Sequence, residues 1–240
     1  MTNAGDSSPD GVVSIIPARS GSRRFPDKNI AYLGPKRLIE WVVSSALACQ
    51  AISSVYVSTD SDRYAEIARL AGAVPIARPP ELSTETISSE AVVSHSLKNL
   101  DIIGVRPKIA VVLQPTSPLT KTETITKAIS AVVANFDTAL SVFPADKKPW
   151  WALKMNPDGS LERYMAPPRD QSKEFEAKLF YPTGGVYAFK TDFFRRTSML
   201  IGGRICGIPV NWYEAIDIDY EHDLEFANFV LEHYASDITK

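Results

Sequence analysis

The stretch IIPARSGSRRFPDKN, Ile15 to Asn29, joins an apolar run to a segment of basic and small residues. The apolar run, Val12 to Ala18, predicts a buried strand. The basic residues that follow it are Arg19, Arg23, Arg24 and Lys28. Small residues let a backbone turn approach a phosphate, and arginines bind phosphate oxygens in pairs. The stretch therefore predicts a phosphate-binding loop at the end of a strand, with a solvated surface turn as the alternative.

The same order of strand and helix recurs along the chain. Strands are expected at 54–60, 73–77, 108–118, 138–143 and in GGVYAF, and helices at 38–49, 62–71, 88–100, 122–134 and from Tyr220 onward. This alternation predicts an α/β fold with a doubly wound, mostly parallel sheet. Its ligand crevice should lie at the carboxyl ends of the strands.

Two segments depart from this rhythm. Residues 1–10 are polar and are expected to form a disordered tail before a single domain, 11–240. Between Pro144 and Pro182 the chain carries several prolines and the pair Trp150–Trp151. Because aromatic side chains need partners to bury against, this segment predicts an inserted arm or lid and not a flexible linker.

Composition narrows the classes of function. The formal net charge of −2 does not favour nucleic-acid binding. No stretch is long and apolar enough to predict a membrane span, and the polar start does not resemble a signal peptide. Cys49 and Cys206 lack metal-ligand spacing and predict two thiols of a reducing, cytoplasmic compartment, with a disulfide between them as the alternative.

Common catalytic signatures are missing from the sequence. It has neither G-x-x-x-x-G-K-[ST] nor G-x-G-x-x-G, so no P-loop or dinucleotide fingerprint is predicted. Without G-x-S-x-G, a hydrolase has no support either. The spacing of His95, His222 and His233 suggests no triad or metal site, and structural or exposed roles are expected for them.

Five blocks in order resemble the cytidylyltransferases that activate keto-sugar acids, in particular the CMP-sialic acid synthetases and their legionaminic and pseudaminic acid relatives. The blocks are PARSGSRRFPDKN (17–29), VSTDSDRYAEIA (57–68), ARPPELSTETISS (77–89), VVLQPTSPL (111–119) and AIDIDYEHDLEFA (215–227). The resemblance implies a Rossmann-like nucleotidyltransferase fold whose inserted arm builds a homodimer. It implies CTP and a nine-carbon keto-sugar acid as substrates, pyrophosphate as a product, and Mg²⁺ as the cofactor.

The resemblance assigns the first block to the triphosphate. Arg19 is expected near the α-phosphate, and Arg23 and Lys28 near the β- and γ-phosphates, with Arg19 and Lys28 also catalytic. Ser22 and Asn29 are expected to contact the nucleotide, and Asn29 also to shape the loop. Arg23 stands where relatives often have lysine, which keeps the charge and changes its geometry.

The third block is expected to read the base through Arg78, the carbonyl of Ile87, and Ser89. An arginine donates to the carbonyl oxygen and N3 of cytosine, and a carbonyl accepts from its amine. Uracil would reverse this pattern and leave buried polar groups unpaired. The alternative for Ser88 or Ser89 is to cap the following helix, and the two roles are compatible.

Sugar-binding residues are implied in three places. Gln114 is expected at the carboxyl end of its strand, Arg169 in the arm, and Tyr187 in the pocket wall. Tyr181 and Tyr187 have core packing as an alternative. The chain departs from the family pattern at Thr120, where arginine is usual, and at YPTGGVY, which replaces an NGA-x-Y type of pattern.

Asp217 and Asp219 are expected on one side of a strand, because alternate residues of a strand share a face. Two carboxylates with phosphate oxygens and water suit Mg²⁺. A solvated acidic edge, with Asp219 capping the last helix, is the alternative. Asp219 is also a candidate acceptor for the proton of the sugar hydroxyl.

Two other functions stay open. One is activation of an eight-carbon acid such as Kdo, and the other is nucleotide binding without catalysis. Retention of Arg19, Lys28, Gln114, Asp217 and Asp219 together argues against the second.

Overall fold

A computed structural model describes residues 11–166 and 178–234 of the chain. The expected tail and the candidate Arg169 lie outside these residues. Within the described part, no helix combines the length and the apolar character that crossing a bilayer requires. Cys49 and Cys206 are both free thiols, so the alternative of a disulfide is wrong.

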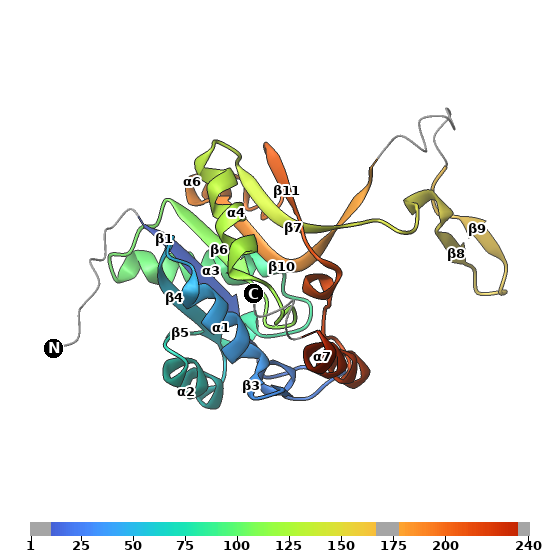
Figure 1. Cartoon of the computed structure of the whole chain (residues 1–240). Helices are drawn as coiled ribbons and strands as arrows, with labels where there is room; N and C mark the ends of the chain where they lie inside the picture. Colours follow the sequence, from blue (N-terminus) through green and yellow to red (C-terminus); the bar gives the residue numbers. More distant parts are fainter. Residues whose placement is uncertain (1–10, 167–177, 235–240) are drawn as a thin grey trace.

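A seven-stranded sheet forms the centre of the molecule (Figure 1), in the order β11-β7-β10-β6-β1-β4-β5. Its strands are β1 (Val12–Pro17), β4 (Ile52–Thr59), β5 (Val74–Ala77), β6 (Ile109–Leu113), β7 (Thr138–Pro144), β10 (Phe180–Lys190) and β11 (Ile205–Pro209). Only β10 runs antiparallel to its two neighbours. The predicted mostly parallel sheet is therefore confirmed.

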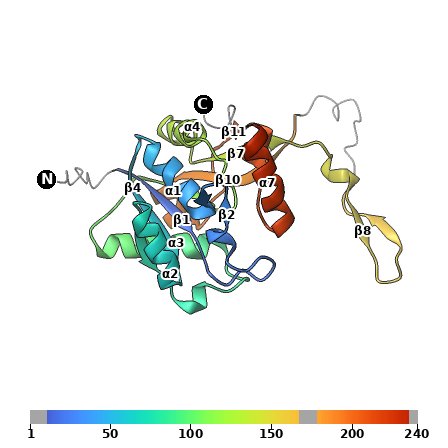
Figure 2. The same ribbon diagram turned by 60° about the horizontal axis from the view of Figure 1, so that its bottom comes forward.

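Helices cover both faces of this sheet (Figures 1 and 2). They are α1 (Leu38–Ala48), α2 (Asp62–Leu70), α3 (Ser89–Ile102), α4 (Thr122–Val133), α6 (Thr191–Thr197) and α7 (Glu221–His233). The inward faces of α1, α2 and α4 pack in one apolar core, and those of α3 and α6 pack in another. In β1, Ile16 joins the first core and Ile15 the second, because successive side chains of a strand point to opposite faces. The fold is doubly wound, as predicted.

The carboxyl ends of the parallel strands bring four polar residues to one edge of the sheet. Arg19 follows β1, Asp60 follows β4, Arg78 follows β5 and Gln114 follows β6. This edge is where ligands bind in open α/β sheets. The functional site is therefore expected there.

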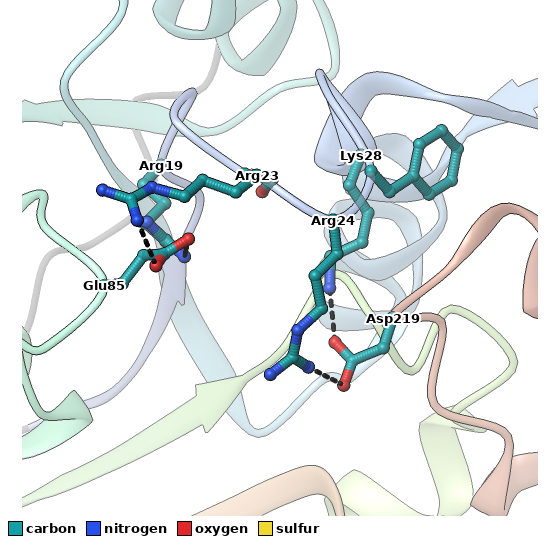
Figure 3. Close-up of a pocket in the computed structure, with 8 residues that line it drawn as sticks. Arg19, Arg23, Arg24, Lys28, Glu85 and Asp219 are labelled. Atoms are coloured by element: carbon teal, nitrogen blue, oxygen red, sulfur yellow. Dashed lines mark hydrogen bonds and ion pairs between the residues drawn. The ribbon is translucent and has the colours of Figure 1, made fainter.

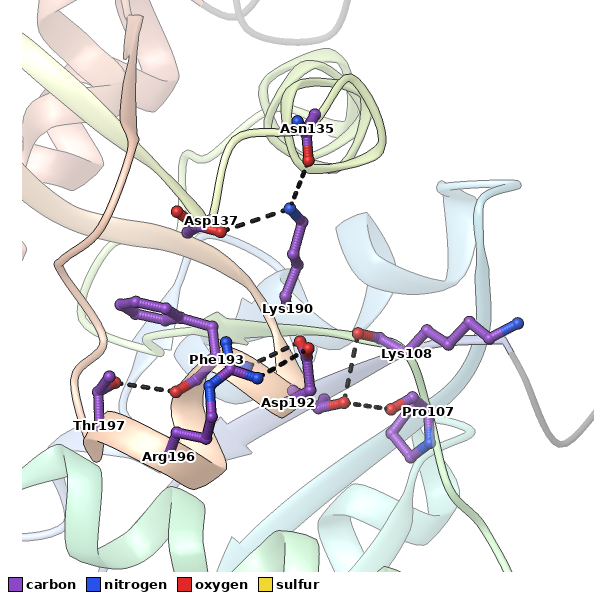
Figure 4. A network of polar contacts seen from close by, with 10 residues as sticks. Pro107, Lys108, Asn135, Asp137, Lys190, Asp192, Phe193, Arg196 and Thr197 are labelled. Atoms are coloured by element: carbon purple, nitrogen blue, oxygen red, sulfur yellow. Dashed lines mark hydrogen bonds and ion pairs between the residues drawn. The ribbon is translucent and has the colours of Figure 1, made fainter.

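A network of polar contacts lies at the opposite edge of the sheet (Figure 4). Because β10 is antiparallel, its end meets the starts of β6 and β7. Lys190 Nζ donates to Asn135 Oδ1 at 2.9 Å and to Asp137 Oδ1 at 3.4 Å. Thr191 Oγ1 donates to the carbonyl oxygens of Pro107 and Lys108. These contacts hold the reversed strand in register.

The inserted segment leaves the body as an extended arm (Figures 1 and 2). Its described part contains a 3₁₀ turn, η3 (Pro149–Trp151), and a small hairpin of β8 (Leu153–Met155) and β9 (Leu161–Arg163). Both strands of the hairpin are exposed along their length. An inserted arm or lid was expected for this segment from its prolines and its tryptophan pair.

Three features differ from the sequence prediction. Residues 216–219, which include Asp217 and Asp219, form an irregular segment after a 3₁₀ turn, η4 (Trp212–Ala215), so the predicted strand is wrong. The segment is tied to the rest of the fold by Ile218 N, which donates to Thr116 O at 2.8 Å. The edge strand β11 and the short hairpin of β2 (Tyr32–Leu33) and β3 (Lys36–Arg37) were not predicted.

Candidate active site

The side chains of Asp60 and Asn29 hold the loop after β1 through hydrogen bonds. Ser20 donates through its backbone N and its Oγ to the Asp60 carboxylate, at 2.9 and 3.1 Å. Asn29, which is buried, donates from Nδ2 to the carbonyl of Arg19 at 2.9 Å. This hydrogen bond ties Asn29 to the backbone of the loop. Its amide group lies beneath the loop.

Lys28 is positioned by a strained residue that precedes it. Asp27 has φ 54°, a left-handed value uncommon for a residue other than glycine. Arg63 Nη1 and the Tyr64 hydroxyl donate to its two carboxylate oxygens at 2.9 and 3.0 Å. Burial, with this hydrogen bond, raises the pKa of Tyr64, so its hydroxyl remains a donor. The two contacts from α2 fix the turn from which Lys28 leaves.

Phe25 anchors the other side of the loop. It packs in a third apolar cluster with Leu38 of α1, Ile218, and Ala227 and Val230 of α7. The cluster joins the loop near the start of the chain to the irregular segment near its end. Burial of these apolar side chains therefore brings the first and last blocks together.

A pocket of about 360 Å³ opens over the loop (Figure 3). Its wall is formed by Arg19, Ser22, Arg23, Arg24, Phe25, Lys28, Glu85 and Asp219. Four basic side chains thus face two carboxylates, a formal surplus of two positive charges. Such a polar, cationic hollow at a strand end suits a phosphorylated ligand.

The basic side chains form two groups within the pocket (Figure 3). Lys28 Nζ donates to Asp219 Oδ1 at 2.7 Å, and Arg24 Nη1 lies 3.6 Å from Asp219 Oδ2. Arg23 Nη1 and Arg19 Nη2 lie 3.5 and 4.0 Å from the two oxygens of Glu85. Each carboxylate therefore holds two cations, one pair on either side of the hollow.

Asp217 and Asp219 form the acidic part of this region. Asp217 has an exposed side toward solvent. Protein atoms crowd the rest of its carboxylate, and this loss of hydration raises its pKa. A hydrogen bond from Thr116 opposes the rise, and the charge of Asp219 adds to it. Asp223 caps α7. Its Oδ2 accepts hydrogen bonds from the backbone N of Asp219 and of Tyr220 at 2.9 and 2.8 Å.

These two aspartates offer carboxylate oxygens of the kind that a divalent cation binds. Their carboxylates interact electrostatically, and both are open to solvent. Among the described residues, no group of three or more histidine, cysteine, aspartate or glutamate side chains is arranged to hold a metal. Mg²⁺ bound here would therefore take further oxygen ligands from phosphates and water, which is its usual behaviour.

The expected base-reading residues are not part of the wall of this pocket. Arg78 is only 6% exposed, and its Nη2 donates to Ser58 O at 2.7 Å while its Nε has no protein partner. Burial lowers its pKa to about 10, so it stays charged at neutral pH. Ser88 Oγ accepts from Ala91 N at 3.2 Å, so the predicted capping of this helix is done by Ser88. Ser89 is the first residue of α3, directly after Ile87 and Ser88.

The expected sugar residues in the described part lie on adjacent strands. Gln114 directly follows β6, and Tyr187 of β10 pairs with Val112 of β6. Tyr187 is half-buried, and its pKa is raised by burial and by the nearby charges of Asp217 and Glu90. Gln114 and Tyr187 thus lie along the same edge as the aspartates.

The two positions at which the chain departs from the family pattern, Thr120 and the segment YPTGGVY, lie close together. A Cβ on Gly185 would lie 2.7 Å from Thr120 Oγ1, which is far too close for a normal contact. Thr120 is buried and donates to Ser117 O at 2.9 Å. The close approach requires a glycine at position 185 and a small residue at position 120.

Several residues of the pocket had no expected role. Arg24, Phe25 and Glu85 line the hollow, and Asp60 holds its loop. Arg24 belongs to the basic run and was visible there. Asp60 and Glu85 lie in the second and third family-like blocks, but only the folded chain brings them to the loop. The three histidines have local contacts: His95 with Asn99, His222 with Asp223 and His233 with Phe229.

The fold is that of the nucleotidyltransferases. A solved CMP:2-keto-3-deoxy-manno-octonic acid synthetase in complex with CTP superposes with a TM-score of 0.69 at 17% identity, covering 94% of this chain and 100% of that one. The chain belongs to the cytidylyltransferase family, whose sequence profile matches residues 13–190.

Curated relatives agree with this family. The chain is 35% identical over 151 residues to a CMP-N,N'-diacetyllegionaminic acid synthase of Legionella pneumophila, covering 62% of this chain and 65% of that protein. It is 27% identical to an N-acylneuraminate cytidylyltransferase of Escherichia coli over 90% of this chain and 51% of that protein. It is 32% identical to a 3-deoxy-manno-octulosonate cytidylyltransferase of Anaeromyxobacter dehalogenans over 92% and 97% of the two chains. The chain thus spans between half and two thirds of the first two relatives.

Proposed function

We propose that this protein transfers CMP from CTP to a nine-carbon keto-sugar acid of the sialic type and releases pyrophosphate. The observation that carries the proposal is the pocket in which Arg19, Arg23, Arg24 and Lys28 face Asp219 at the carboxyl end of β1. Family membership supports cytidine as the base, and the legionaminic and neuraminic acid relatives support the sugar class.

In the proposed reaction, the anomeric hydroxyl oxygen forms a bond to the α-phosphorus of CTP. The bond from that phosphorus to the bridging oxygen of the β-phosphate breaks, and pyrophosphate leaves. Arg19, Arg23 and Lys28 stabilise the phosphate charge, with Arg19 nearest the α-phosphate and Ser22 and Asn29 supporting the loop. Asp219 is the candidate acceptor for the hydroxyl proton.

The other roles follow the positions of the side chains. Arg78, the Ile87 carbonyl and Ser89 read cytosine, and the buried Arg78 cation with an unpaired Nε fits a base that offers two acceptors. Gln114, Tyr187 and Arg169 bind the sugar acid. Asp217 and Asp219 hold Mg²⁺, which would neutralise phosphate charge when bound.

A turnover panel tests the function. Pyrophosphate release is measured with CTP and each of three acids: N-acetylneuraminate, a legionaminic-type acid and Kdo. The proposal expects release with a nine-carbon acid, dependence on Mg²⁺, and little activity with UTP. CTP binding without any turnover would instead indicate a nucleotide-binding protein without catalysis.

Activation of an eight-carbon acid is the second candidate. It is favoured by one observation, the match over nearly the whole length of a 3-deoxy-manno-octulosonate cytidylyltransferase. Turnover with Kdo and with no nine-carbon acid in the panel would support it. In that case the cytidylyltransferase assignment would stand, and the sugar assignment would change.

We further propose that the arm makes the enzyme a homodimer. We also propose that the enzyme is located in the cytoplasm. Trp151, Leu153, Met155, Leu161 and Tyr164 are exposed on the arm, which extends away from its own body. A second copy that covers these side chains would remove them from water. Light scattering should give twice the chain mass for the wild type, and Leu161→Asp should shift the mass toward the monomer. A monomeric wild type would contradict the proposal.

A further inference from the structure

Glu85 is the second carboxylate of the cationic pocket, and the proposed reaction gives it no role. It lies between a 3₁₀ turn, η2 (Pro80–Leu82), and α3. Its carboxylate oxygens lie 4.0 Å from Arg19 Nη2 and 3.5 Å from Arg23 Nη1 (Figure 3). The two arginines therefore contact a carboxylate where the proposed function expects phosphate.

Packing does not explain this position. The Glu85 side chain is 39% exposed, and that of Arg23 is 83% exposed. Ion pairs as exposed as these contribute little to folding stability. Glu85 can thus change without loss of the fold, and its effect should appear in the pocket's affinity for anions.

Asp219, the other carboxylate of the pocket, differs from Glu85 in how deeply its cation partner is buried. Asp219 contacts Lys28, whose side chain is only 12% exposed, at 2.7 Å, and its charge acts on Asp217. Asp219 is itself 46% exposed, and it is tied to a cation that is largely buried. Glu85 sits on a connecting segment opposite, and it faces only the arginine pair.

We propose that Glu85 is a counter-charge that competes with the polyphosphate for Arg19 and Arg23, and so limits the affinity of the pocket for free pyrophosphate. The inference rests on the proposed function and deepens it. A bound pyrophosphate either displaces the Glu85 carboxylate from the arginines or lies beside it and is repelled. Both cases weaken binding of the leaving product, which favours its release.

Calorimetric titration with inorganic pyrophosphate tests this inference without any sugar acid or turnover. Glu85→Gln removes the charge and keeps the shape, and it should bind pyrophosphate about two- to fivefold more tightly than the wild type. The gain should shrink as salt is raised, because salt screens exposed charges. Glu85→Asp, which keeps the charge, should stay near the wild-type affinity.

Glu66→Gln is the matched control. Glu66 on α2 also pairs with an arginine, Arg69, at 2.9 Å, and is not part of the pocket wall. This variant has the same net charge as Glu85→Gln and should bind pyrophosphate as the wild type does. A purely structural role for Glu85 predicts weaker binding on substitution, so the direction of the change separates the two explanations.

The outcomes also distinguish a failure of the role proposed for Glu85 from a failure of the proposed transferase function. Equal or weaker pyrophosphate binding by Glu85→Gln, beside a wild type that binds, would overturn the role of Glu85 and leave the transferase proposal intact. Absence of pyrophosphate binding in both the wild type and Glu85→Gln would overturn both. An equal gain in Glu66→Gln would show a general charge effect and would also overturn the role of Glu85.

Discussion

Lys28 Nζ donates a hydrogen bond of 2.7 Å to Asp219 Oδ1, across 191 positions of sequence. The contact joins the basic loop after β1 to the acidic segment before α7. It places a cation and a carboxylate on the same pocket, where the proposed transfer would use the cation to stabilise phosphate charge and the carboxylate to hold a metal ion. A pocket with Lys28 turned away from Asp219 would not support the proposed function.

Asp219→Ala should lower turnover about a hundredfold or more, because it removes a proposed metal ligand and proton acceptor. The free energy of unfolding should fall by about 1 kcal/mol or less, since the side chain is partly exposed. Steady-state rates across a Mg²⁺ series and urea unfolding measure the two effects. Asp219→Asn, which keeps the shape, is the control, and near-normal rates at low Mg²⁺ would contradict the metal role.

Arg78→Ala should weaken binding of CTP more than binding of tripolyphosphate, because the side chain is proposed to contact the base. Calorimetry with both ligands gives the comparison. Arg78→Lys keeps a charge without the planar group and should also lose base recognition. An equal loss for CTP and tripolyphosphate would show that Arg78 acts on the phosphates or on the fold instead.

Gly185→Ala should destabilise the protein by about 1–3 kcal/mol, because the added Cβ would lie 2.7 Å from Thr120 Oγ1. The double variant Gly185→Ala/Thr120→Ala should recover part of that loss, since it removes the atom in the way. Urea unfolding of the four proteins forms a double-mutant cycle. Strictly additive losses would show that Thr120 is not the source of the clash.

Asp137 should make stability depend on pH in the acid range. The backbone N–H of Arg204 and the Lys190 ammonium hold the pKa of this carboxyl below its usual range. Its contribution to stability is therefore present above the pKa of the unfolded chain and is lost as pH falls through the lower pKa of the folded state. Asp137→Asn should be less stable than the wild type at pH 7, and the difference should close in strong acid. A difference independent of pH would contradict this account.

Much of the fold could be predicted because its signals are local. The helix from Thr122 and the strand of TALSVF have their own periodicity, and both were predicted within a few residues of their bounds. The edge strand β11, with the sequence ICGIP, was missed because it is short and carries two residues that strands disfavour. The segment 216–219 alternates as a strand does. It lies outside the sheet, and its backbone is hydrogen-bonded to Thr116 in the turn after β6.

The sequence by itself determined the alternation of strands and helices, the basic loop after the first strand and the identity of Lys28 and Asp219 as candidates. These are properties of neighbouring residues, and periodicity and composition report them directly. Only the tertiary structure decided that Glu85 and Asp60 face that loop and that Asp217 and Asp219 lie outside the sheet. Contacts between distant segments depend on how the apolar faces pack, and no local pattern records that packing.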